Sequence, residues 1–206
     1  MTAEWPVDLD GVTETVVTTL GPNDRWNVAA LGVHAPKGDG DPGRDGDPAT
    51  GGSAATARTW GRTRTWRNFR EEGGGYVQFT RDPVTFAEAA MTVRETDDPV
   101  LEEADAWVRV DASEVDSGTD GDTQWVEWEL VPRESGVERE AVPAINRGFY
   151  AVVEATVAAS RLDVDAYDTD RLLERLAYFE DVVERCGGER ERAAFDVVRR
   201  QVDAEW

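Results

Sequence analysis

Residues 12–33 read VTETVVTTLGPNDRWNVAALGV. The first part, Val12 to Leu20, is rich in β-branched residues, and apolar residues resume from Trp26 to Val33. Between them stands Gly21-Pro22-Asn23-Asp24, a run of residues that favour turns. Two strand-like runs around such a turn predict a β-hairpin.

Strand-like and helix-like patterns follow the hairpin in a definite order. Strands are predicted over 58–65, 76–80, 106–110 and 124–131, and helices from Asp82-Pro83 onward, over 149–159 and 171–185, and around Phe195 and Val198. Trp125 and Trp128 are three residues apart, so a regular strand would turn them to opposite faces. Strands followed by helices predict an α+β fold, with a β-barrel and a C-terminal helical extension.

The same order predicts how the chain is divided. Residues 1–135 are expected to form the barrel, and residues 136–206 a mainly helical part packed on it. The segment 36–55 is dominated by Gly, Asp, Pro, Ala and Thr, which predicts a mobile loop inserted between strands.

The chain is strongly acidic, with 43 Asp and Glu against 22 Lys and Arg and a formal charge of -21. High salt screens the repulsion between such charges, which is typical of proteins from a salt-filled cytoplasm. With 40% hydrophobic residues and eight tryptophans, the chain is not expected to be disordered. Uniform acidity also argues against a nucleic-acid-binding face.

Several classes of chemistry find no support in the sequence. No apolar run is long enough to span a bilayer, and the first ten residues do not resemble a signal peptide, so no membrane contact is expected. A single histidine, His34, and a single cysteine, Cys186, give no metal-ligand motif and no oriented nucleophile pair. No metal is expected, and no catalytic residue stands out.

The least acidic stretch is Thr56 to Arg70, called the arginine island below. It holds five arginines and no Asp or Glu: Arg58, Arg62, Arg64, Arg67 and Arg70. Threonines and an asparagine lie between them, and guanidinium, hydroxyl and amide groups together are the donors that bind phosphate. The alternative is that these arginines pair with carboxylates elsewhere in the chain.

Four motifs, in order, resemble an archaeal family of uncharacterised flavoproteins that is similar to flavin reductases and has the FMN-binding split-barrel fold. They are NVAALG at 27–32, TRTWRN at 63–68, VQFTRDP at 77–83 with Phe86, and AINRG at 144–148 with Glu154. The resemblance implies bound FMN, an antiparallel split β-barrel, and a homodimer with the flavin near its interface.

The resemblance also implies roles for individual residues. Asn27, Ala29 and Ala30 would approach the isoalloxazine ring, and Thr63, Thr65 and Asn68 would bind the phosphate or the ribityl chain. Arg62, Arg64 or Arg81 would assist. The family often has Gly-Ser where this chain has Arg62-Thr63, so the resemblance does not fix which group donates to the phosphate.

Three hypotheses about function follow. The first is a flavin-dependent oxidoreductase acting on a small molecule, in which the cofactor carries the chemistry and few catalytic side chains are needed. The second is an FMN carrier or sensor without turnover. The third is an interaction module whose arginine island binds an acidic partner.

Overall fold

The computed structural model describes residues 3–36, 54–142 and 144–206. These form two compact units: Met1–Phe79 with Glu95–Glu140, and Thr80–Arg94 with Ala141–Trp206. The division therefore differs from a single boundary near residue 135, because residues 80–94 group with the C-terminal helices. The predicted loop insertion lies almost wholly outside the described residues, and its last residue, Ala55, begins a strand.

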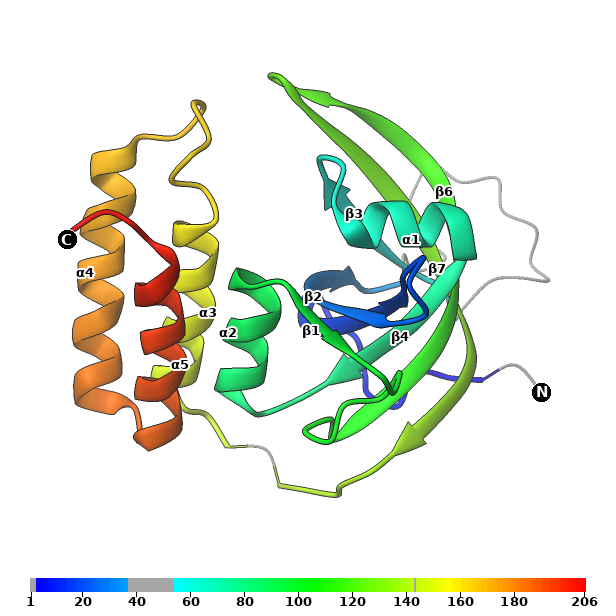
Figure 1. Ribbon diagram of the computed structural model, residues 1–206. Helices are drawn as coiled ribbons and strands as arrows, with labels where there is room; N and C mark the ends of the chain where they lie inside the picture. Colours follow the sequence, from blue (N-terminus) through cyan, green and yellow to red (C-terminus); the bar gives the residue numbers. More distant parts are fainter. Residues whose placement is uncertain (1–2, 37–53, 143) are drawn as a thin grey trace. The chain divides into compact units, whose positions relative to one another are not determined.

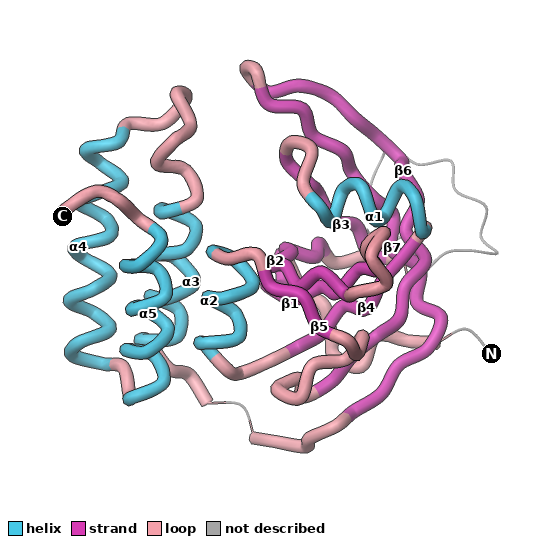
Figure 2. The backbone as a smooth tube through the Cα atoms, viewed as in Figure 1, coloured by secondary structure: helices cyan, strands magenta, loops and turns pink. Residues whose placement is uncertain are grey.

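The first unit is an antiparallel β-barrel (Figures 1 and 2). Its strands are β1 (Val12–Leu20), β2 (Trp26–His34), β3 (Ala55–Trp60), β4 (Gly74–Phe79), β6 (Ala106–Asp120) and β7 (Thr123–Val137). They pair in the order β1-β4-β6-β7-β3-β2, and β1 pairs with β2 to close the barrel. A short strand, β5 (Arg94–Thr96), adds to β2. The predicted α+β fold with an antiparallel barrel is confirmed.

The predicted hairpin is the β1–β2 pair. Its register runs from Leu20 opposite Trp26 to Val12 opposite His34. The turn closes by a backbone hydrogen bond of 2.8 Å from the Gly21 amide to the Arg25 carbonyl. By contrast, β3 meets β2 only at Val33 and His34, so most of β2 extends past that pairing.

The barrel core is built from alternating strand residues and one helix. Val17, Val77 and Leu130 are completely buried in it. Helix α1 (Arg64–Glu72) contributes Phe69, whose ring lies 5.4 Å from that of Trp128 on β7. Because Phe69 and Trp128 are 1% and 2% exposed, α1 is held to the barrel by core packing.

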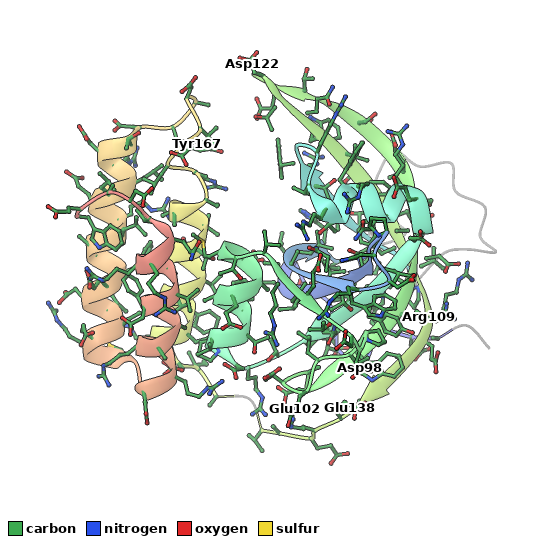
Figure 3. The ribbon with its side chains drawn as sticks, in the orientation of Figure 1. Asp98, Glu102, Arg109, Asp122, Glu138 and Tyr167 are labelled. Atoms are coloured by element: carbon green, nitrogen blue, oxygen red, sulfur yellow. The ribbon has the colours of Figure 1, made fainter. Side chains whose placement is uncertain are left out.

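Strands β6 and β7 are longer than predicted and form an extended arm. Strands were predicted only over 106–110 and 124–131, but the acidic segment between these ranges continues both strands, up to Asp120 and from Thr123. Asp122 marks the tip of the arm (Figure 3). Gly118 lies under the Trp125 ring, where any added Cβ would stand 2.7 Å from the indole. The Trp125 ring thus covers the backbone of β6 at Gly118 and helps β6 and β7 to remain paired although the arm is polar in sequence.

The second unit is a helical cluster, as predicted for the C-terminal part. It contains α2 (Pro83–Met91), α3 (Arg147–Ala159), α4 (Thr169–Cys186) and α5 (Glu189–Gln201). Asp82 caps α2 and Asn146 caps α3, each by accepting backbone amides. Both caps are tied to the start of α5, Asp82 by an ion pair with Arg190 and Asn146 by a 2.8 Å hydrogen bond to Glu191. The motifs at 77–83 and 144–148 thus each contain a helix start.

Gly148 is a position where the helical unit is sensitive to added volume. A Cβ there would stand 2.6 Å from the Gly187 Cα, which belongs to backbone and cannot rotate away. Gly148→Ala is expected to cost about 1–3 kcal/mol of unfolding free energy, measured by denaturant titration. Gly188→Ala is the control, because its Cβ meets only the end of the Glu191 side chain. Equal losses in the two variants would contradict this packing.

Candidate functional site

The arginine island bends through a turn and changes from strand to helix. Its strand was predicted over 58–65, but β3 ends at Trp60 and α1 begins at Arg64. Gly61 has a φ of 68°, which favours glycine and turns the chain between the two elements. The strand prediction is confirmed for residues 58–60 and wrong beyond Trp60, because alternating Arg and Thr fits a strand, whereas Thr63 here serves as a helix cap.

The N-terminus of α1 presents hydrogen-bond donors and has no acidic residue of its own. Thr63 caps the helix, its hydroxyl oxygen accepting the Trp66 amide at 3.1 Å. The helix offers no acceptor for the amides of Arg64 and Thr65. Its first turn contains no acidic residue. Amides without an acceptor in the helix and the positive end of the helix dipole make such a terminus suited to a phosphate.

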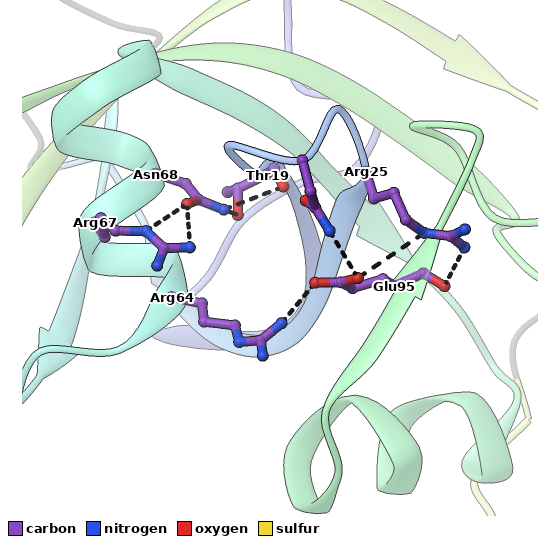
Figure 4. Close-up of polar contacts among 7 residues, drawn as sticks. Thr19, Arg25, Arg64, Arg67, Asn68 and Glu95 are labelled. Atoms are coloured by element: carbon purple, nitrogen blue, oxygen red, sulfur yellow. Dashed lines mark hydrogen bonds and ion pairs between the residues drawn. The ribbon is translucent and has the colours of Figure 1, made fainter.

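Asn68 fastens α1 to the β1–β2 hairpin (Figure 4). Its side chain is 1% exposed, and its amide nitrogen donates to the Thr19 hydroxyl at 3.0 Å and to the Thr19 carbonyl at 3.3 Å. Its oxygen accepts from Arg67. These contacts engage both ends of the amide, so Asn68 positions the helix.

The same threonine connects α1 to β2. Thr19 is the register partner of Asn27, which is 6% exposed. Ala29 packs against the barrel core, and Ala30, its neighbour on the strand, lies on the opposite face of β2. Asn27 and Asn68 therefore both lie next to Thr19. The methyl groups of Ala29 and Ala30 point to opposite faces of β2, so only one of them can face a ligand on a given side of the strand.

Arg64 is held by a carboxylate that the motifs did not indicate. Its Nη1 donates to Glu95 Oε1 at 2.6 Å. The other oxygen of Glu95 accepts from Asn23 at 3.1 Å and lies 3.9 Å from Arg25 Nε (Figure 4). Sequence reasoning missed Arg25, Glu95 and Thr19, because their contacts join segments far apart in the chain and leave no local pattern.

The remaining island arginines separate into two groups. Arg58 stacks on Trp125 at 4.1 Å and lies 3.8 Å from Glu127. The guanidinium carbons of Arg62 and Arg70 lie 5.9 and 5.4 Å from the centre of the Trp66 ring on α1. Within the described parts of the chain, Arg62, Arg67 and Arg70 form no ion pair with a carboxylate. Pairing with acidic residues thus accounts for Arg58 and Arg64 only.

Two further predicted residues, Thr65 and Arg81, take no part in the contacts around Thr19 and Glu95. Thr65 is buried at the start of α1. Arg81 belongs to the second unit, just before α2, and is not among the residues joined around Thr19. Among residues 3–36, 54–142 and 144–206, no group of three His, Cys, Asp or Glu side chains is placed to hold a metal ion.

Two family models match most of this chain. A model described as the N-terminal domain of a protein of unknown function, DUF447, matches residues 13–139, and a second DUF447 model matches residues 146–200. The chain belongs to the DUF447 family. The comparison with curated proteins found no match.

Solved structures include a DUF447 relative. An FMN-bound protein of this family from Methanosarcina mazei is 25% identical, with a TM-score of 0.77 over 95% of this chain and 97% of that one. Component B of nitrilotriacetate monooxygenase from Mycobacterium thermoresistibile is 15% identical, with a TM-score of 0.41 over 64% of this chain and 72% of that one. An FMN-binding protein from Thermus thermophilus is 14% identical, with a TM-score of 0.39 over 67% and 81%.

The length and apolarity of the helices of this DUF447 protein can be compared with what a membrane span requires. In the parts of the chain that the structure describes, none is both long enough and apolar enough to cross a bilayer.

Proposed function

We propose that this DUF447 protein binds FMN in its barrel unit, with the phosphate at the N-terminus of α1 and the isoalloxazine ring along β2. The observation that carries the proposal is the likeness, over nearly the whole chain, to an FMN-bound member of the same family. The α1 terminus supports it independently, because the donors of a phosphate site stand there without an acidic residue in the first turn.

The groups of the chain fit a phosphate monoester in number and kind. The amides of Arg64 and Thr65 and the hydroxyl of Thr63 would donate hydrogen bonds, and the guanidinium groups of Arg62 and Arg64 would supply charge. Asn68 would act indirectly, by fixing α1 on the hairpin through Thr19. Asn27, Ala29 and Ala30 would border the ring.

The proposed activity is that of a flavin-dependent oxidoreductase on a small molecule. When bound, the flavin supplies the hydride chemistry. The residues of the chain would bind the cofactor and orient it. Adding NADH or NADPH to the flavin-loaded protein separates this activity from the alternative, an FMN carrier or sensor, since only the enzyme is expected to bleach the flavin within seconds.

The proposal extends to a homodimer in a salt-rich cytoplasm. The first unit exposes apolar surface that a second copy would cover, including Trp60, which is 47% exposed and pairs in register with Trp125. Exposed aromatic residues at a strand pair are typical of interfaces. The formal charge of -21 would be screened at high salt.

A paired titration with FMN and riboflavin tests the proposed site. The two ligands share the ring and ribityl chain and differ in the phosphate. Because a charge-assisted hydrogen bond contributes about 1.5–3 kcal/mol, FMN is expected to bind at least about tenfold more tightly than riboflavin. Equal affinity would contradict a phosphate site at α1, and binding of neither ligand would contradict the function itself.

A further inference from the structure

We propose that Glu95 is an internal counter-anion of the phosphate site, which occupies Arg64 until a phosphate takes its place and thereby sets the selectivity for phosphorylated flavin. This inference rests on the proposed function and adds a residue that neither the motifs nor the family relationship indicated.

The first argument is the geometry around the carboxylate. Arg64 is the first residue of α1, next to the cap residue Thr63, and its side chain reaches across to Glu95 on β5 with a bond of 2.6 Å. Arg64 is thus a cation at the phosphate-binding end of the helix that already has an anionic partner. A phosphate at this terminus would compete with Glu95 for the same guanidinium group.

The second argument is that Glu95 can release Arg64 without losing all its partners. Its Oε2 accepts from Asn23 at 3.1 Å, and Arg25 donates to its backbone carbonyl at 3.3 Å. Arg25 Nε also lies 3.9 Å from the carboxylate. A carboxylate that keeps these contacts is not left as an unpaired charge, so the exchange at Arg64 costs little.

The third argument is the charge of the cluster. Arg25 and Arg64 are balanced by Glu95 and by Asp97, which lies 3.1 Å from Arg25 Nη1. The four side chains together are neutral, and their partial exposure lets Arg64 move. A phosphate with nearly two negative charges competes better for Arg64 than a single carboxylate does, whereas an uncharged ligand such as riboflavin offers nothing in exchange.

The test is Glu95→Gln, which keeps the shape of the side chain and removes its charge. In low salt the FMN dissociation constant is expected to fall about three- to tenfold, since one unit of negative charge near the phosphate is gone. The direct comparison is riboflavin, which lacks the phosphate and whose affinity is expected to stay unchanged. In molar salt the gain for FMN should shrink.

Glu134→Gln is the matched control, because Glu134 also faces an arginine, Arg109, at 3.7 Å on the barrel strands and lies outside the cluster. It should leave both ligands unaffected. The gain from Glu95→Gln should also disappear when Arg64 is replaced by Gln, since the competition is for that residue. If Glu95→Gln does not fold, Glu95→Asp, which draws the carboxylate back from Arg64, is expected to tighten FMN as well.

Three results would overturn the inference. Weaker FMN binding by Glu95→Gln would mean that Glu95 positions Arg64 for the phosphate. An equal change for FMN and riboflavin, or the same gain in the Arg64→Gln background, would mean that the effect does not involve phosphate at Arg64. Failure of the wild type to bind FMN would instead overturn the proposed function, and this inference with it.

Discussion

The Trp128→Ala variant is expected to lose about 3–5 kcal/mol of unfolding free energy, the usual cost of removing a large buried aromatic side chain. Trp128 is 2% exposed, and its ring packs against Phe69 of α1 at 5.4 Å. Its indole nitrogen also donates to the hydroxyl of Thr59 at 2.9 Å. The variant leaves a cavity beneath α1 and removes the donor for a buried hydroxyl.

Trp125→Ala is the matched control on the same strand. Trp125 lies on the opposite face of β7 and stacks with Arg58 at 4.1 Å. Its replacement removes this partly exposed cation–π contact and the cover over Gly118, but it opens no cavity in the barrel core, so the loss is expected to be smaller, about 1 kcal/mol. Denaturant titrations of both variants in the same salt measure the difference, and similar losses would contradict the assignment of the two faces.

The Arg64→Ala variant is expected to raise the FMN dissociation constant about tenfold, because a charge-assisted contact with the phosphate is removed. This rise is smaller than it would be for an arginine without a carboxylate partner, since in the wild type the Arg64 side chain must leave Glu95 before it binds the phosphate. Riboflavin binding should not change. Fluorescence titration of each ligand gives the comparison.

Arg70→Ala is the control for this prediction. Arg70 belongs to the same arginine island and to the same helix, but it stands in the last turn of α1, away from the phosphate-binding end. Its replacement is expected to change FMN affinity by less than about twofold at moderate salt. Equal losses in the two variants would show that FMN responds to the general charge of the island.

The fold could be predicted from the sequence where the signal is local. The hairpin of β1 and β2 is set by its turn residues, and α2 by Asp82 and the proline after it. Helix α1 was missed because the alternation of Arg and Thr over residues 62–65 fits a strand, and because the position of the helix is fixed by Phe69 in the barrel core. The long β6–β7 arm was missed because strand pairing and aromatic cover override its polar composition.

The candidate site was predictable only in part, for a similar reason. Composition and the TRTWRN motif indicated Thr63 and Arg64, and the structure puts both at a helix N-terminus. Asn68 stands in the same motif, yet its contacts with Thr19 are structural. Glu95 is thirty-one residues from Arg64 in the chain, and only the folded structure brings them together.

The most direct test of FMN binding is the visible absorption spectrum of the protein freshly purified in high salt. The proposed function predicts a yellow protein with a flavin band near about 450 nm, which is lost on unfolding and restored by refolding with FMN. A colourless, folded protein that takes up no FMN on reconstitution would contradict it.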